Sequence, residues 1–168
     1  MPPFPGISPP RLLLACCVVL VAFSACDAGA PEQTPPPAPG TAGHPRDVNI
    51  VTREYGYSPP VVDLVPGETV LFHVVNAGLE IHEVVIGDVG VQDAWEAAEA
   101  ATAGAPPGPT PAVSVTPALA GLRIVVPSGA RVDALWTVPT DGPPLIVGCH
   151  IPGHWEKGMQ VPIRMVSP

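Results

Sequence analysis

The chain has 168 residues and a formal net charge of −8, because 15 acidic side chains outnumber 7 basic ones. This balance disfavours a nucleic acid or an anionic lipid surface as a binding partner, since both carry negative charge themselves. It suits docking to a basic partner, and solubility alone would also explain it. The length corresponds to about one domain, and the 26 Pro and 17 Gly are spread unevenly along the chain.

The first 25 residues have the pattern of an export signal. Arg11 is followed by an apolar run over residues 12–23, which is too short to span a bilayer as a helix and is typical of a secretory signal. Behind it, Ser24-Ala25-Cys26 resembles a bacterial lipobox, although Phe23 stands where Leu is usual. We predict a signal peptide over 1–25 and a lipid on Cys26. Simple signal cleavage nearby and a retained N-terminal anchor helix are the alternatives.

Residues 26–46 consist largely of Pro, Ala and Gly, with almost no bulky apolar side chain. Such a segment cannot bury a core, so we expect a flexible, extended tether that holds the folded domain away from a membrane. His44 lies in this tether and is interpreted as an ordinary solvated side chain.

The folded domain is expected over residues 47–168, where short β-rich runs alternate with turn residues. In the run 69–76, bulky apolar side chains recur at every second position from Val70 to Val74, which is the period of a strand with one buried face. The expected strands are 48–54, 61–65, 69–76, 81–86, 121–126, 131–138, 145–149 and 159–166. Seven or eight strands in a domain of this length indicate a β-sandwich.

Residues 89–118 interrupt the β pattern. The stretch 91–103 is rich in helix formers and has its acidic residues early, which suits the positive end of a helix dipole. The Pro- and Gly-rich stretch 104–111 after it predicts a flexible linker. We therefore expect a short helix followed by a linker, inserted between two strands of the sandwich.

Cysteine usage singles out Cys149. Cys16 and Cys17 lie in the apolar run and Cys26 lies at the end of the signal, so the folded part keeps a single thiol. Exported domains usually pair their cysteines, and metal binding would give an unpaired thiol both protection and a role. Cys149 is followed at equal spacing by His154 and Met159. Cys, His and Met are the ligands of a blue copper site, which needs one more His.

His82 supplies that second histidine. It lies in the strand-like run 81–86, where a period of two places it on the same face as Val84 and Ile86 and therefore toward the core. The predicted site holds one copper ion, cycling between Cu(I) and Cu(II), through His82, Cys149, His154 and an axial Met159. Taken singly, each of these residues has a structural alternative as a core histidine, a small buried thiol or a packing methionine.

With these residues the chain resembles a known family, the cupredoxins, which include plastocyanin, azurin and auracyanin. The likeness has two separated halves within 48–168. The first half contains Tyr57-Ser-Pro-Pro, Val65-Pro-Gly67, Asn76 and His82, and the second is Cys149-x₄-His154-x₄-Met159, whose spacing is most similar to auracyanin and rusticyanin. The resemblance implies an all-β Greek-key β-sandwich with a short helical insertion, and it carries over His82, Cys149 and His154 as equatorial ligands and Met159 as the axial one.

His150 and Glu83 depart from the simple pattern. A His directly after the Cys is similar to the run of multicopper oxidases, where it binds a trinuclear copper cluster. The sequence contains no His-x-His pair, so we exclude a trinuclear site and interpret His150 as a strand or loop residue near the metal. Glu83 follows the first His where several cupredoxins have Asn, so hydrogen bonding to the thiolate can differ.

The resemblance implies a one-electron carrier rather than an enzyme. We expect a monomer at the periplasmic or extracytoplasmic face of the membrane, attached through Cys26, that exchanges electrons with redox partner proteins. The exposed edge of His154 would be the electron port, with Trp155 beside it. The alternative is an exported copper chaperone or buffer, although such proteins usually carry several Met and His in exposed clusters and this chain has three Met. A copper-free adhesion or assembly domain would be expected to lack one of the four ligands.

Overall fold

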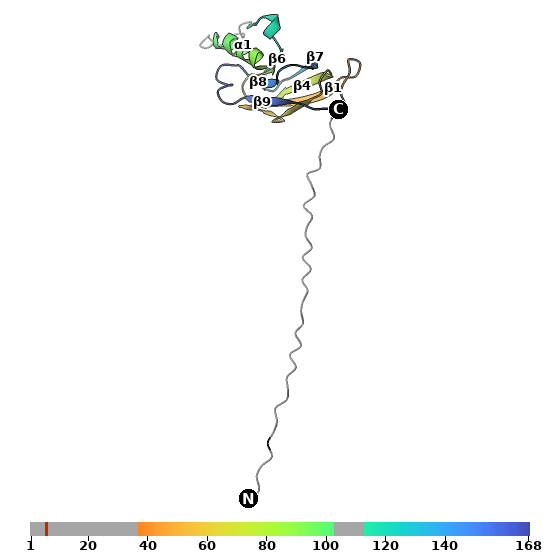
Figure 1. Ribbon diagram of the computed structural model, residues 1–168. Helices are drawn as coiled ribbons and strands as arrows, with labels where there is room; N and C mark the ends of the chain where they lie inside the picture. The colour runs from red at the N-terminus through yellow and green to blue at the C-terminus, as the bar shows by residue number, and fades with distance from the viewer. Residues whose placement is uncertain (1–5, 7–36, 103–112) are drawn as a thin grey trace. The chain divides into compact units, whose positions relative to one another are not determined.

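The structure, a computed structural model, describes residues 6, 37–102 and 113–168 (Figure 1). The predicted signal segment 1–25 apart from residue 6, the lipobox cysteine Cys26 and the linker 104–111 lie outside the described residues. Two β-sheets and one α-helix make up the folded part. None of the helices in the described ranges is both long enough and apolar enough to cross a membrane.

The first sheet has four strands in the order β2-β1-β4-β7. Their bounds are β1 (Arg46–Arg53), β2 (Gly56–Ser58), β4 (Thr69–Asn76) and β7 (Arg131–Thr137). β1 runs parallel to β4, with Ile50 opposite Val74, and β7 runs antiparallel on the other side of β4. The predicted alternation along β4 is confirmed, because Val70, Phe72 and Val74 are all fully buried.

The second sheet has five strands in the order β3-β9-β8-β5-β6. Their bounds are β3 (Val62–Leu64), β5 (His82–Gly87), β6 (Leu122–Val126), β8 (Ile146–Gly148) and β9 (Gln160–Met165). β5 lies inside the sheet, antiparallel to both β6 and β8. All six of its residues are buried, since Val84 and Ile86 face the core between the sheets while Val85 is covered from the outside.

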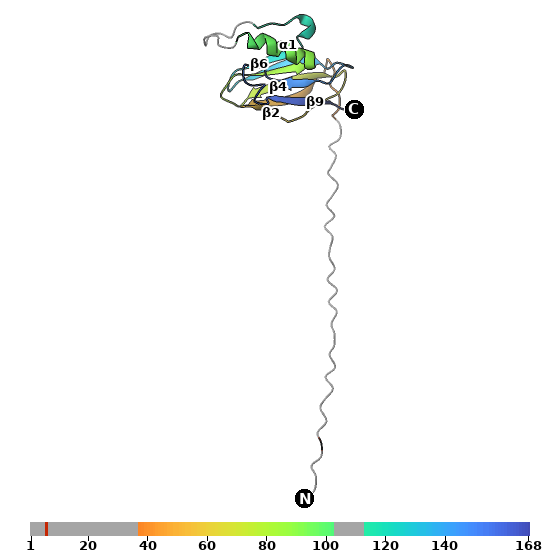
Figure 2. The same ribbon diagram turned by 60° about the vertical axis from the view of Figure 1, so that its left-hand side comes forward.

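The outside cover is the helix α1 (Val89–Ala100), which lies along one face of the sandwich (Figure 2). The side chain of Asp88 caps the helix by accepting a hydrogen bond from the backbone N–H of Val91 at 3.0 Å. This cap explains why the helix begins two residues before the predicted 91. Val91 and Trp95 then pack on Val85. The 3-10 turn η1 (Pro117–Leu119) completes the described part of the insertion.

The predicted all-β sandwich with a short helical insertion is confirmed. The described residues contain nine strands, one more than the upper expectation, and the additional strand is β2. It pairs three residues antiparallel with the end of β1, and three residues are too few to show a periodic pattern.

The start of β1 is fastened to the sandwich by Glu68, whose side chain is fully buried. Nε of Arg46 donates to Oε2 of Glu68 at 2.8 Å, and the backbone N–H of Gly40 donates to the same oxygen at 3.2 Å. Gly40 and Arg46, which belong to the predicted tether, are therefore in contact with the folded domain. The C-terminal residue Pro168 borders the same surface pocket as Gly40, so both ends of the described domain lie together.

Candidate metal centre

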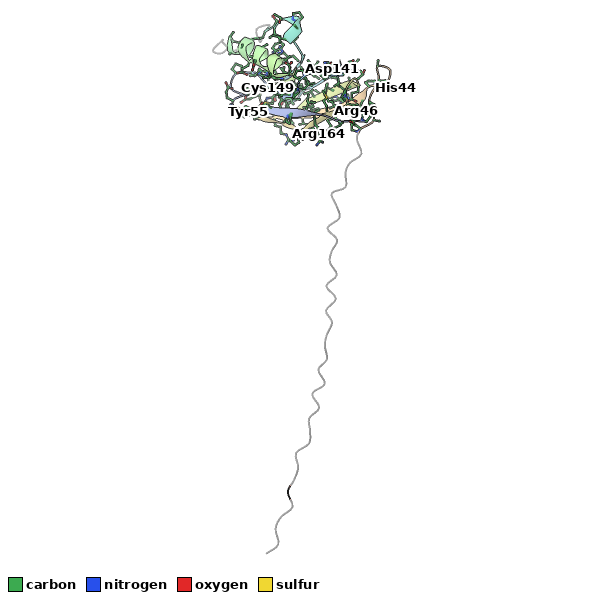
Figure 3. The ribbon with its side chains drawn as sticks, in the orientation of Figure 1. His44, Arg46, Tyr55, Asp141, Cys149 and Arg164 are labelled. Atoms are coloured by element: carbon green, nitrogen blue, oxygen red, sulfur yellow. The ribbon has the colours of Figure 1, made fainter. Side chains whose placement is uncertain are left out.

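The topology brings two distant segments together at one end of the five-stranded sheet. His82 is the first residue of β5, and Cys149 directly follows β8. Because β5 and β8 are antiparallel neighbours, with Val85 opposite Gly148, the start of one strand meets the end of the other. Figure 3 shows Cys149 at this end of the sandwich, away from Arg46.

Three of the four predicted ligands form one compact group. The ligand atoms of His82, Cys149 and His154 all lie within 4.8 Å of one another. The exposed fractions of these residues are 0% for His82 and Cys149 and 3% for His154. Sγ of Cys149 is 3.3 Å from Nδ1 of His154 and accepts a hydrogen bond from the backbone N–H of Glu83 at 3.4 Å. Two imidazoles and one thiol thus converge in a site closed to bulk water.

One nitrogen of this group shows that the donor set fits a metal ion. Within the described part of the chain, Nδ1 of His82 is buried and has no hydrogen-bond partner. Burying an unpaired polar atom is unfavourable, and each such atom in a native fold calls for an explanation. A cation held between His82, Cys149 and His154 would satisfy the nitrogen. The side chains present therefore suit a metal centre better than they suit a closed hydrogen-bonded core.

The thiol of Cys149 is protonated in the absence of a metal ion. Burial raises its pKa to about 12, and the backbone N–H groups of Glu83 and Ile151 offset only part of this effect. A thiolate, not a thiol, is the metal ligand. Binding of a cation must therefore release the proton of Cys149, and the affinity is expected to increase with pH.

The fourth predicted ligand, Met159, is fully buried beside the group. Its carbonyl oxygen accepts a hydrogen bond from the N–H of Cys149, and its own N–H donates to the carbonyl oxygen of His154, both at 3.1 Å. Gly153 and Gly158 have φ angles of 88° and 85°, a left-handed conformation that glycine adopts most readily. The loop 149–159 is therefore closed on itself by its own backbone and holds Met159 next to the cysteine and the histidine.

The predicted exposed edge of His154 is wrong. Nε2 of His154 lies 2.9 Å from a carboxylate oxygen of Glu80, and the ring of Tyr55 stands edge-on at 5.0 Å. The hydroxyl of Tyr55 donates to Glu80 at 3.0 Å, while Nζ of Lys157 lies 3.8 Å from the centre of the Tyr55 ring. These side chains leave only 3% of His154 exposed, so a partner at this end meets a charged cover before it meets the imidazole.

His82 has a carboxylate at its outer nitrogen as well. Nε2 of His82 lies 3.3 Å from Oε1 of Glu54, and the same oxygen accepts the backbone N–H of Glu80 at 2.7 Å. That N–H is the main cause of a pKa of about 2 for Glu54. The hydroxyl of Tyr55 and then the imidazole of His154 lower the pKa of Glu80. Sequence reasoning missed both glutamates; the position of Glu80 two residues before His82 was the one available signal.

His150 belongs to the opposite side of the ligand loop. Its Nδ1 lies 2.8 Å from Oε2 of Glu96 and its Nε2 lies 2.7 Å from Oε1 of Gln92, both on α1. Trp155 stacks on the imidazole with ring centres 4.8 Å apart. His150 is therefore a loop residue adjacent to the site and held by the helix, and the half-buried Trp155 packs on it.

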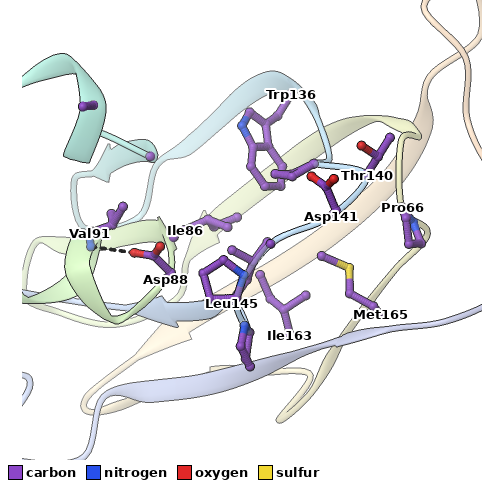
Figure 4. Close-up of a pocket in the computed structure, with 17 residues that line it drawn as sticks. Pro66, Ile86, Asp88, Val91, Trp136, Thr140, Asp141, Leu145, Ile163 and Met165 are labelled. Atoms are coloured by element: carbon purple, nitrogen blue, oxygen red, sulfur yellow. Dashed lines mark hydrogen bonds between the residues drawn. The ribbon is translucent and has the colours of Figure 1, made fainter.

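A cavity of about 600 Å³ lies at the other end of the strands (Figure 4). Its walls include Ile86, Trp136 and Leu145, together with Asp88 and a loop rich in proline. The carboxylate of Asp88 is already engaged in capping α1. Among the described residues that line this cavity there is no His or Cys, so it is separate from the group around Cys149.

Comparison with known proteins agrees with this architecture. No protein-family model and no curated protein matches the sequence. Among solved structures, the dithionite-reduced auracyanin of Roseiflexus castenholzii superposes with a TM-score of 0.60 at 17% identity, covering 71% of this chain and 96% of that chain. Auracyanin A of Chloroflexus aurantiacus, described as a "blue" copper protein, gives 0.59 at 17% identity over 73% and 99% of the two chains. An azurin of Methylomonas sp. strain J gives 0.54 at 13% identity over 73% and 98%.

The chain thus has the cupredoxin fold, the fold of auracyanin and azurin. At these identities the likeness establishes the architecture, and it confirms the fold class predicted from the sequence.

Proposed function

We propose that this protein is a type-1 copper protein that carries one electron at a time, with one copper ion bound by His82, Cys149, His154 and Met159. The observation that carries the proposal is the buried convergence of the first three side chains, with Nδ1 of His82 left without a partner among the described residues. The similar fold of auracyanin A, a blue copper protein, supports it. When bound, such an ion supplies reversible one-electron oxidation and reduction.

The residues of the chain suit an electron carrier because they hold the site in one arrangement. The backbone hydrogen bonds between Cys149 and Met159 and between Met159 and His154 close the ligand loop. The N–H of Glu83 is directed at the sulfur of Cys149 and would stabilise its thiolate. The ligand side chains are buried away from water, which suits electron exchange through the protein, so we propose a carrier and not an enzyme.

We further propose that the protein acts as a monomer at the extracytoplasmic face of a membrane and exchanges electrons with redox partner proteins. The apolar run 12–23 and the lipobox-like Ser24-Ala25-Cys26 support export and attachment by a lipid. The burial of Cys149 also supports export, because an exposed free thiol would be at risk in an oxidising compartment.

Titration of the full-length protein with Cu(II), followed by visible absorption and electron paramagnetic resonance, tests the function. We expect one copper per chain and an intense blue charge-transfer band from the thiolate. A pale spectrum without that band would instead favour a copper chaperone or buffer. Failure to bind copper at a ratio of one to one would overturn the proposal.

A further inference from the structure

The outer nitrogens of both candidate ligand histidines face carboxylates. Nε2 of His82 lies 3.3 Å from Glu54, and Nε2 of His154 lies 2.9 Å from Glu80. The two imidazoles are buried, with side-chain exposures of 0% and 4%, while the two glutamate side chains are 28% and 50% exposed. The glutamates thus stand between the metal group and the solvent.

This arrangement selects one tautomer for each imidazole. An ionised carboxylate can only accept hydrogen bonds, so Nε2 of His82 and of His154 must carry the proton and donate. The lone pairs are then on the Nδ1 atoms, which face inward. Nδ1 of His154 lies 3.3 Å from the sulfur of Cys149, and Nδ1 of His82 is buried and unpaired within the described residues. Both inner nitrogens are ready to bind a cation without a change of tautomer.

The two glutamates are themselves held in place by each other's segments. Oε1 of Glu54 accepts the backbone N–H of Leu79 and, at 2.7 Å, that of Glu80. In return, the hydroxyl of Tyr55, the residue after Glu54, donates to Oε1 of Glu80 at 3.0 Å. The turn after β1 and the segment before β5 are therefore cross-linked by hydrogen bonds in both directions. Neither carboxylate can leave its imidazole without breaking bonds to the other segment.

We propose that Glu54 and Glu80 act as a pair of positioning residues that orient the two ligand imidazoles and lower the reduction potential of the bound copper. This inference rests on the proposed function. Two negative charges next to the ligands attract Cu(II) more strongly than Cu(I), because the Coulomb energy is proportional to the charge of the ion. A carboxylate on the outer N–H also makes an imidazole a stronger donor, which again favours the oxidised ion.

The test compares Glu54→Gln and Glu80→Gln in the full-length, copper-loaded protein. Glutamine keeps an oxygen that can accept from Nε2 but removes the negative charge. We expect each change to reduce the preference for Cu(II) over Cu(I) by about tenfold, which raises the potential by about 59 mV for a one-electron couple. Glu156→Gln is the matched control, because Glu156 is an exposed acid on the ligand loop. The reduction potential of this variant should stay close to that of the wild type.

A second measurement needs no copper. Nitrogen NMR of the metal-free protein should show His82 and His154 with the proton on Nε2. A proton on Nδ1 of either residue would overturn the inference. So would a normal blue band with potentials in both glutamate variants equal to that of Glu156→Gln. Absence of a blue band in the wild type would instead refute the proposed function, and the NMR result would then decide the orienting role alone.

Discussion

The loop 149–159 has two sides that differ in how completely their imidazole nitrogens are paired by hydrogen bonds. The metal side, formed by Cys149 and His154 against His82, leaves one buried nitrogen free, since Nδ1 of His82 has no partner among the described residues. The helix side, formed by His150 against α1, pairs both imidazole nitrogens with oxygens of Gln92 and Glu96. Adjacent residues of one loop thus serve a binding site and a hydrogen-bonded core.

Gln92 is the centre of the helix side. Its amide nitrogen lies within hydrogen-bond distance of three backbone carbonyl oxygens, those of Val85, Gly87 and Ile146, at 3.3, 3.3 and 3.0 Å. Its amide oxygen faces His150 at 2.7 Å. Native proteins often depart from full polar satisfaction at functional sites, and the unpartnered nitrogen of His82 is one such departure. Stability is therefore expected to depend on the helix side and copper binding on the metal side.

The largest effect is expected from Cys149→Ser on the metal side. A hydroxyl is a harder and weaker ligand than a thiolate for this metal, so the blue charge-transfer band should disappear completely. Circular dichroism should show that the fold is retained, because the change is nearly isosteric. A variant that stays blue would show that Cys149 is not a ligand. The assignment of copper binding to the metal side would then be wrong.

Gln92→Leu tests the helix side. The change leaves His150 and three backbone carbonyl oxygens without their amide partner, so we expect the free energy of unfolding to fall by about 3 kcal/mol. Urea denaturation measures this loss, with Asp93→Asn on the exposed part of the same helix as the control. The blue band of the folded protein should remain. Loss of copper binding at unchanged stability would contradict the division between the sides.

The helix side should also make stability depend on pH, through Glu99. Burial and the neighbouring carboxylate of Glu83 raise the pKa of Glu99 to about 7, even though Arg123 contacts both groups. The folded protein keeps this proton up to about pH 7, whereas the unfolded chain loses it near pH 4.3. The free energy of unfolding should therefore fall, by on the order of 2 kcal/mol, as pH rises between these values.

Glu99→Gln should remove that slope, which denaturation at a series of pH values can show. The comparison is between the two proteins, so carboxylates that titrate in both cancel. An identical slope in the variant and the wild type would mean that Glu99 is ionised throughout this range.

The smallest effect is expected from Met159, whose long bond contributes little to affinity in sites of this kind. Met159→Leu should raise the reduction potential and Met159→Gln should lower it, because an oxygen donor favours Cu(II). Each step should change the preference between the two ions by about tenfold, or about 59 mV. Voltammetry of the three proteins gives the order directly, and equal potentials would make Met159 a packing residue.

Much of the fold was predictable because its signals are local. Alternating residues in β4 and turn residues between the runs predict the strands, and the fixed spacing of Cys149, His154 and Met159 predicts the ligand loop. His82 could be added to the predicted ligands because the strand period places its side chain on the same face as Val84 and Ile86, toward the core. The convergence of His82 with Cys149 and His154 in space agrees with that reasoning.

The surroundings of the site could not be predicted because they depend on contacts between distant segments. Glu80 and His154 are 74 residues apart, and no sequence pattern indicates that one covers the other. For the same reason the sequence suggested an exposed His154. The pairing of His150 with α1 joins residues 54 and 58 positions apart. The helix that the sequence predicted only as an insertion therefore supports the ligand loop.

The start of β1 and the C-terminus lie at the end of the domain that is opposite the candidate metal site. Arg46 at the start of β1 lies at the end of the sandwich opposite Cys149 (Figure 3), and the C-terminus is marked at the same end (Figure 1). The eight residues of β4 that separate these ends correspond to about 25 Å of extended strand. A protein immobilised on an electrode or fused to a carrier through its C-terminus would therefore keep its copper end facing the solution. The same geometry leaves that end free to collide with soluble molecules while the opposite end is attached.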